Sequence, residues 1–185
     1  MSQKKSLAPY IVALLGAAAV VLIFWLSRDG GGPVVPGRPA PEFDAFALDG
    51  TPRNLKQYEG KVVLLNIWAT WCPPCQQEMP SMQRLREAIP DEDFAILAVS
   101  IDAPPGEEDT FGREGGNLEI FAREMGLTFQ ILHDPTGKIQ EIYQTTGVPE
   151  SFVVDREGVI FKKVAGPTEW DAPVNVQLIQ RLLDG

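Results

Sequence analysis

Residues 64–80 read LLNIWATWCPPCQQEMP and contain the only two cysteines of the chain, Cys72 and Cys75. An apolar run precedes the pair, and Pro73 follows Cys72 at a position that suits the first residue of a helix. A cysteine there lies near unsatisfied backbone N–H groups and the positive end of the helix dipole, which favour the reactive thiolate. Cys75, one turn later, is close enough to form a disulfide with Cys72.

Several other uses of the two cysteines can be weighed against a redox couple. A structural disulfide closing so short a loop removes little entropy from the unfolded chain. A zinc site needs four ligands, and the chain has one histidine, His133, besides the two cysteines. A cysteine hydrolase using His133 would leave Cys75 without a role. No histidine follows the pair, which argues against covalent haem attachment. We therefore interpret the pair as a reversible redox couple and expect no metal and no cofactor.

Residues 7–26 read LAPYIVALLGAAAVVLIFWL and contain no charge. As a helix they would span about 30 Å, the thickness of the bilayer's hydrocarbon core. Tyr10 and Trp25 lie near the two ends, where aromatic rings favour the membrane interface. The only Ala-x-Ala motif in the N-terminal segment, at residues 17–19, lies inside the apolar run and makes a poor signal-peptide cleavage site. We predict an uncleaved transmembrane anchor, with a cleaved signal peptide as the alternative.

The charges around this segment predict its orientation and the domain organisation. Lys4 and Lys5 favour a cytoplasmic stub at residues 1–6, which places residues 42–185 in the periplasm or extracytoplasmic space. The protein is then a single-pass protein of the inner or plasma membrane, with a signal-anchor. Residues 27–41 are rich in glycine and proline and are expected to form a tether. A formal net charge of −9 makes nucleic acid an improbable partner.

Hydrophobic patterns divide residues 42–185 into strands and helices. Buried strands are predicted at residues 62–69 and 94–101, separated by a helix over residues 73–89. A polar loop over residues 102–116 follows the second strand. Further elements are a first hairpin turning at Asp49 and Gly50, a helix at 117–126, a short strand at 129–132, a helix at 137–147, a hairpin over 151–166 and a helix at 173–183. The pattern predicts an α/β fold with a mixed central sheet flanked by helices.

Two motifs carry a resemblance to a known family. The stretches WATWCPPCQQEMP and GVPESFVVDREGVI, in a frame of about residues 39–183, resemble the membrane-anchored thioredoxin-like thiol-disulfide oxidoreductases of the TlpA/ResA/DsbE family, which act in cytochrome c biogenesis. The resemblance implies a thioredoxin fold with an N-terminal β-hairpin extension. It also implies that Cys72 attacks and Cys75 resolves, that the Val148–Pro149 bond is cis, and that Trp71, Val148 and Pro149 contact the substrate.

Position 66 departs from ordinary thioredoxins, which carry a buried aspartate there to handle the proton of the second cysteine. Asn66 cannot titrate. Glu78, three residues after Cys75, matches a glutamate typical of the ResA and DsbE branches, and a carboxylate near that thiol can take its proton. An exposed helix charge is the alternative. Pro80 matches the proline within the family's active-site helix, and Glu150 is open between partner recognition and loop structure.

The resemblance implies a reductase of protein disulfides, such as those of apocytochrome c or a haem-handling protein, recharged by a membrane electron donor of the DsbD/CcdA kind. Two alternatives share the fold. A peroxiredoxin-like thiol peroxidase needs a threonine and a proline where this chain has Ala69 and Leu65. A non-catalytic metal- or partner-binding module would leave the couple without a role; copper chaperones, for example, use a wider cysteine spacing and a histidine.

Overall fold

The computed structural model describes residue 16, residues 32–90 and residues 92–185. The predicted stub at residues 1–6 and nearly all of the predicted anchor at residues 7–26 lie outside the described residues. In the part of the chain that is described, no helix is both long enough and apolar enough to cross a membrane. The chain divides into two units, Met1–Pro33 and Val34–Gly185. The second unit carries the sheet and the cysteine pair and is described here.

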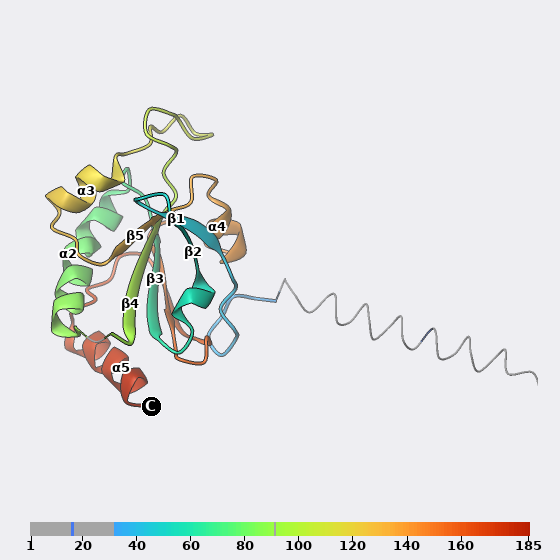
Figure 1. Ribbon diagram of the computed structural model, residues 1–185, viewed down its shortest axis with the longest axis vertical. Helices are drawn as coiled ribbons and strands as arrows, with labels where there is room; N and C mark the ends of the chain where they lie inside the picture. Colours follow the sequence, from blue (N-terminus) through green and yellow to red (C-terminus); the bar gives the residue numbers. More distant parts are fainter. Residues whose placement is uncertain (1–15, 17–31, 91) are drawn as a thin grey trace, which may run out of the picture. The chain divides into compact units, whose positions relative to one another are not determined.

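Seven strands form one sheet in the order β2-β1-β5-β4-β3-β6-β7 (Figure 1). The neighbours β3, β4 and β5 run parallel, and all other neighbouring pairs are antiparallel. The sheet is therefore mixed, as the sequence predicts, and the hairpin β1–β2 extends it at one edge. The strands are β1 (Asp44–Ala47), β2 (Pro52–Asn54), β3 (Val62–Trp68), β4 (Phe94–Ser100), β5 (Gln130–His133), β6 (Glu150–Val154) and β7 (Ile160–Ala165).

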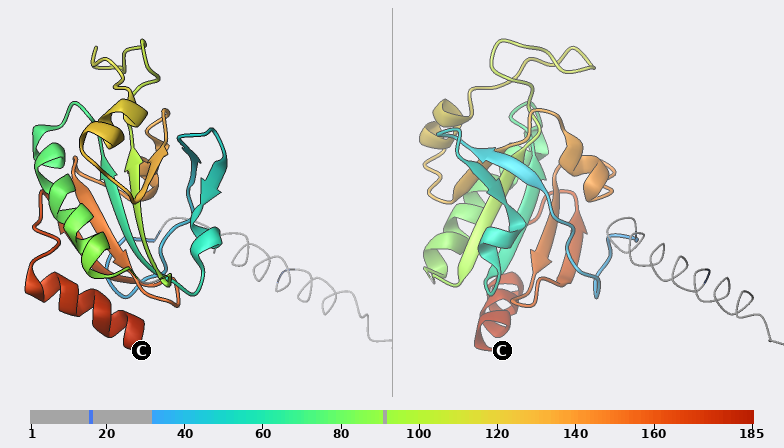
Figure 2. Two further views of the ribbon diagram at one scale, coloured as in Figure 1. Left: turned by 60° about the vertical axis from the view of Figure 1, so that its left-hand side comes forward. Right: turned by 45° about the vertical axis from the view of Figure 1, so that its right-hand side comes forward.

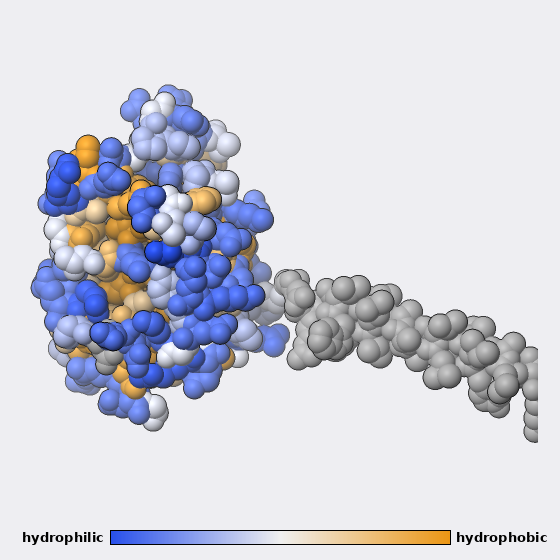
Figure 3. Space-filling model, viewed as in Figure 1, coloured by the Kyte–Doolittle hydropathy of each residue, from blue (hydrophilic) through white to orange (hydrophobic). Residues whose placement is uncertain are grey.

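Helices cover both faces of this sheet. The views in Figures 1 and 2 place α2 (Pro73–Ala88), α3 (Leu118–Glu124) and α5 (Pro173–Asp184) on one face, and α4 (Lys138–Ile142) on the other. A short 3-10 helix, η1 (Leu55–Tyr58), connects β2 to β3. Hydrophilic residues cover most of the face seen in Figure 3, and hydrophobic residues gather on the side where α2 and α3 lie. The architecture is a thioredoxin-like α/β fold.

One predicted helix is shorter than expected. The sequence favours a helix over residues 137–147, but α4 ends at Ile142. Gln144 adopts a φ of 50°, in the left-handed region, and a right-handed helix cannot continue through such a residue. The remaining residues form the turn that leads to β6.

Strand β3 is the centre of the core. All seven of its residues are buried, which explains its continuous apolar run, VVLLNIW. It pairs with β4 on one side and β6 on the other, so both of its edges are occupied. Three residues separate the end of β3 at Trp68 from Cys72. The best-buried element of the fold therefore fixes where the cysteine pair begins.

The predicted boundary between tether and domain is wrong. Residues 34–41, placed in the tether on composition, belong to the folded unit. Val34 is buried, Gly37 N–H donates to the Ile160 carbonyl at 2.8 Å, and Ile160 N–H donates to the Arg38 carbonyl at 2.8 Å. The segment pairs with the start of β7, a long-range contact that a Gly/Pro-rich composition does not reveal.

We expect a chain that starts at Glu42 to be less stable than one that starts at Val34. The shorter chain loses the burial of Val34 and the hydrogen bonds to the start of β7, together worth about 2–4 kcal/mol. Urea unfolding of the two chains measures the difference. Equal unfolding midpoints and slopes would show that residues 34–41 behave as a tether after all.

Candidate active site

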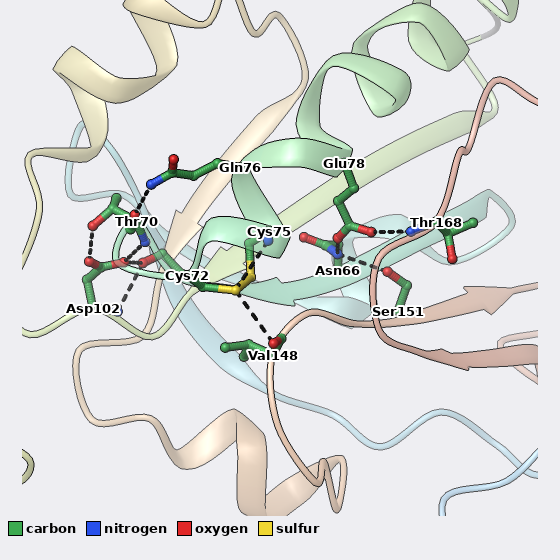
Figure 4. Close-up of a disulfide and its surroundings, with 11 residues drawn as sticks. Asn66, Thr70, Cys72, Cys75, Gln76, Glu78, Asp102, Val148, Ser151 and Thr168 are labelled. Atoms are coloured by element: carbon green, nitrogen blue, oxygen red, sulfur yellow. Dashed lines mark hydrogen bonds between the residues drawn. A yellow bond between two sulfur atoms is a disulfide. The ribbon is translucent and has the colours of Figure 1, made fainter.

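The cysteine pair lies at the N-terminus of α2, just after the short connection from β3 (Figure 4). Cys72 is the N-cap residue, and its sulfur accepts a hydrogen bond from the Cys75 backbone N–H at 3.2 Å. The two residues form a disulfide with their Cα atoms 5.3 Å apart. Cys72 is 4% exposed and Cys75 is fully buried. The two sulfurs thus differ in access: only Cys72 reaches solvent.

The loop before β6 lies against the reactive sulfur. The Val148–Pro149 bond is cis, which confirms the prediction from the resemblance. The Val148 carbonyl oxygen lies 3.5 Å from Cys72 Sγ, and Figure 4 shows it directed at that sulfur. Pro149 is buried, whereas Val148 is partly exposed. An extended chain bound beside Cys72 would therefore meet the backbone of Val148.

Trp71 directly precedes Cys72 and is partly exposed. The guanidinium carbon of Arg113 lies 3.5 Å from the centroid of the Trp71 ring, a cation–π contact. Asp109 holds Arg113 in place through an ion pair at 2.5 Å. Arg113 comes from the polar loop over residues 102–116, and sequence reasoning missed it because nothing local marks a partner 42 positions away. The loop therefore contributes to the active-site surface.

Asp102 is a second residue that the sequence analysis missed. It is fully buried at the end of β4 and accepts hydrogen bonds from Thr70 N–H at 2.8 Å, Ser100 Oγ at 2.6 Å and Gly116 N–H at 3.2 Å. The Thr70 hydroxyl also bonds to it. Asp102 thus fixes the turn before Cys72 to the polar loop. One sequence feature could have indicated Asp102: it is an acidic residue just after a buried strand, and the carboxyl ends of parallel strands commonly carry site residues.

Glu78 is buried, so the alternative of an exposed helix charge is wrong. Its Oε1 accepts a hydrogen bond from Asn66 Nδ2 at 2.6 Å, and its Oε2 accepts one from Thr168 N–H at 3.0 Å. Cys75 and Glu78 project from the same side of α2 towards β3 (Figure 4). Desolvation raises the pKa of Glu78 from 4.5 to about 7, against the opposing effect of the hydrogen bonds from Thr168 and Asn66. Glu78 can therefore change its protonation state near neutral pH.

Two further residues have structural roles. Glu150 is buried, accepts a hydrogen bond from Thr146 N–H at 3.0 Å and pairs with Lys163 Nζ at 3.0 Å. These contacts hold the loop that contains Val148 and Pro149, so loop structure accounts for Glu150. His133 lies at the end of β5 with Nε2 2.8 Å from the Asp102 carbonyl oxygen, which fits the strand-end position that the sequence indicated.

Together these features define the class of protein. A Cys-x-x-Cys pair at the N-terminus of a helix, facing a cis-proline loop on a mixed sheet, is the arrangement of thioredoxin-like redox proteins. The AhpC/TSA family matches residues 36–163. The thiol-disulfide oxidoreductase ResA of Geobacillus thermodenitrificans is 35% identical over 133 residues, 72% of this chain and 71% of that protein. The chain belongs to the AhpC/TSA family and, within it, to the thiol-disulfide oxidoreductases of the ResA type.

Other relatives agree with this assignment. The thioredoxin-like protein YneN of Bacillus subtilis is 38% identical over 124 residues, 67% of this chain and 68% of that protein. Among solved structures, one described as a putative thiol:disulfide interchange protein DsbE from Chlorobium tepidum has a TM-score of 0.64 and 27% identity, covering 80% of this chain and 94% of that one. A putative protein disulfide isomerase from Bacteroides thetaiotaomicron has a TM-score of 0.67 and 28% identity, covering 81% and 91%.

The raised pKa of Glu78 predicts how stability depends on pH. Between pH 4.5 and about 7 the native state binds more protons at this site than the unfolded state, so the free energy of unfolding falls as pH rises. This contribution is complete below pH 4.5 and is lost as pH rises through about 7. Relative to wild type, Glu78→Gln should gain about 2–3 kcal/mol of unfolding free energy between pH 5 and pH 8. Urea unfolding of the oxidised proteins across this range measures it, and a constant difference would contradict the raised pKa.

Proposed function

We propose that this protein is a membrane-tethered, extracytoplasmic reductase of protein disulfides that works through the Cys72–Cys75 dithiol. The observation that carries the proposal is the position of Cys72 at the N-terminus of α2, beside the Val148 carbonyl. The uncharged stretch at residues 7–26 supports the tether, and Lys4 and Lys5 support a cytoplasmic N-terminus. We assign Cys72, Cys75 and Glu78 to catalysis and Trp71, Val148 and Pro149 to substrate contact.

The first step is attack by Cys72 on the substrate disulfide. The helix N-terminus and the Cys75 N–H, which points at Cys72 Sγ, stabilise the thiolate that attacks. A new bond forms between Cys72 Sγ and one substrate sulfur, and the other substrate sulfur leaves as a thiolate. In this proposal the backbone of Val148 pairs with the substrate chain as an added strand, and Trp71 and Pro149 contact that chain; the position of the Val148 carbonyl beside Cys72 supports it.

The second step releases the reduced substrate. Cys75 loses its proton to Glu78, attacks Cys72 Sγ and displaces the remaining substrate sulfur as a thiolate. The enzyme ends with the Cys72–Cys75 disulfide, and the substrate has gained two electrons. A pKa of about 7 suits Glu78 to this role, because the carboxylate is then available to take up the proton near neutral pH.

The residues between the cysteines favour a reductase. Pro73 and Pro74 place no positive charge there, so the Cys72 thiolate lacks the extra stabilisation that a charged residue would give. A less stable thiolate corresponds to a more reducing couple. From the resemblance to the TlpA/ResA/DsbE family, we propose cysteine pairs of apocytochrome c or of a haem-handling protein as substrates, with a DsbD/CcdA-type membrane protein restoring the dithiol. Ala69 and Leu65 argue against the peroxidase alternative.

A cysteine-to-serine pair tests the assignment of roles. In Cys75→Ser, Cys72 should still attack, but the mixed disulfide should persist because the resolving thiol is absent. Partner proteins should therefore accumulate as adducts that disappear on reduction, in the membrane fraction of the native host. Non-reducing electrophoresis followed by mass spectrometry identifies them.

Cys72→Ser is the matched control, since it retains one thiol in the same motif and should yield few adducts. Adducts on Cys72→Ser and none on Cys75→Ser would invert the two roles. Adducts on neither variant would contradict an action on protein disulfides.

The direction of electron flow can be tested through the reduction potential of the couple. We expect a value close to that of thioredoxin, about −270 mV, because no positive charge lies between the cysteines. Equilibration of the full chain against a graded series of thiol redox buffers, followed by thiol labelling, measures it. A value near the about −120 mV of the strong oxidants would contradict the reductase assignment.

A further inference from the structure

Asn66 is fully buried in β3 and uses only part of its side chain (Figure 4). Its Nδ2 group donates two hydrogen bonds, to Glu78 Oε1 at 2.6 Å and to Ser151 Oγ at 2.9 Å. Its Oδ1 is buried and has no partner among the described residues. A buried acceptor without a donor is costly, and each such atom in a native protein calls for an explanation.

The hydrogen bonds around Glu78 suit only one of its two protonation states. The ionised carboxylate accepts from Asn66 Nδ2 and from Thr168 N–H. The neutral acid carries one O–H, which needs an acceptor. The groups that face the carboxyl oxygens are the Asn66 amide, the Thr168 backbone N–H and the Trp170 indole N–H, all of which are donors and cannot provide an acceptor. Protonation of Glu78 therefore requires a rearrangement, or a buried O–H is left without a partner.

We propose that the Asn66 carboxamide turns over when Glu78 is protonated, exchanging the positions of its Nδ2 and Oδ1. Oδ1 then accepts a hydrogen bond from the Glu78 O–H and a second one from the Ser151 O–H. Ser151 can follow because a hydroxyl both donates and accepts. The terminal torsion of asparagine is broad, so the movement needs no change of backbone. Asn66 and Ser151 are thus positioning residues for Glu78, and the inference rests on the proposed role of that residue.

Charges near the network do not replace this switch. Glu78 takes part in none of the ion pairs of the described residues. On β6 and β7, Glu150 and Lys163 pair with each other at 3.0 Å. On its own helix, Arg84 pairs with Asp171 at 2.5 Å. Asn66, Ser151 and Thr168, which contact the carboxyl or its partner, are uncharged. The proton equilibrium of Glu78 is therefore governed by burial and by these hydrogen bonds.

The switch gives both forms of Glu78 a hydrogen-bond partner. A side chain at position 66 that could only donate would stabilise the Glu78 carboxylate alone and would lower the proton affinity of Glu78. A carboxamide that turns over offers either form a hydrogen-bond partner, so the Glu78 carboxyl keeps a partner both when it takes up the Cys75 proton and when it releases it. This is a use that an aspartate at position 66 could not serve in the same way, since it would add a second titrating group.

The test is NMR titration of the oxidised full-length protein in detergent micelles, from pH 5 to pH 9. With the disulfide formed, neither cysteine titrates. The Glu78 carboxyl carbon and the Asn66 side-chain amide should change with one shared midpoint. The two Asn66 amide protons should lose their hydrogen-bonded shifts as Glu78 becomes protonated. Asn66 amide signals that stay constant while Glu78 titrates would overturn the proposal.

Two variants extend the test. If Asn66 bonds both forms of Glu78, Asn66→Leu should move the Glu78 midpoint by less than one pH unit. If Asn66 instead donates only to the carboxylate and does not turn over, Asn66→Leu removes a hydrogen bond from that form alone. The Glu78 midpoint would then rise by about one to two pH units, which would overturn the proposal. Ser151→Ala retains the carboxamide and should preserve the coupled titration, with weaker hydrogen bonding of the Asn66 amide above the midpoint. Loss of coupling in Ser151→Ala while Glu78 still titrates would also count against the switch.

A separate experiment addresses the role of Glu78 on which the inference rests. In single-turnover kinetics, Glu78→Gln should slow release of the reduced substrate more than formation of the mixed disulfide. Unchanged kinetics would refute Glu78 as the proton acceptor, whereas the NMR titration reports on Asn66 without substrate or free thiols. The two failures are therefore distinguishable.

Discussion

The fold and the site both depend on the burial of β3. Both faces and both edges of this strand are occupied, so its position and its register with β4 and β6 are fixed. The register sets Asn66 opposite Ser151 on β6, and it sets where the chain leaves the sheet to begin α2 with Cys72 as the N-cap. The register of β3 cannot shift without exposing its apolar side chains. Its fixed register therefore determines the positions of the disulfide, of the Glu78 carboxyl and of the Asn66–Ser151 contact.

The site combines two kinds of polar group with opposite consequences. Asp102 lies at the end of β4 and is surrounded by hydrogen-bond donors, which makes its burial a means of fixing the backbone before Cys72. Glu78 accepts hydrogen bonds from Asn66 and Thr168, but burial outweighs them and raises its pKa to about 7. Asp102 fixes the backbone of the turn before Cys72, whereas Glu78 can gain or lose a proton near neutral pH. Two buried acids on either side of the cysteine pair thus serve different ends (Figure 4).

The sequence predicted the elements that local patterns define. Continuous apolar runs gave β3 and β4, the Asp49-Gly50 turn gave the first hairpin, and proline after cysteine gave the start of α2. It did not predict contacts between distant segments. The backbone of Gly37 and Arg38 pairs with the start of β7, and Arg113 packs on Trp71, but neither contact has a local signature. The burial of Glu78 was also beyond reach, because a glutamate three residues after a cysteine reads equally well as an exposed charge. The glycine- and proline-rich composition of residues 34–41 led to their wrong assignment to the tether.

The unequal burial of the two cysteines has a consequence if the protein works in the extracytoplasmic compartment proposed above. Cys75 is fully buried, and Cys72, whose sulfur lies 3.5 Å from the Val148 carbonyl oxygen, shows only 4% of its surface. A freely diffusing oxidant must reach a sulfur from a narrow angle, whereas a polypeptide that docks on the loop brings its own disulfide into line. The protein around the cysteine pair therefore shields the dithiol from oxidation by small molecules. The dithiol is oxidised mainly by thiol-disulfide exchange with a polypeptide that docks beside Cys72.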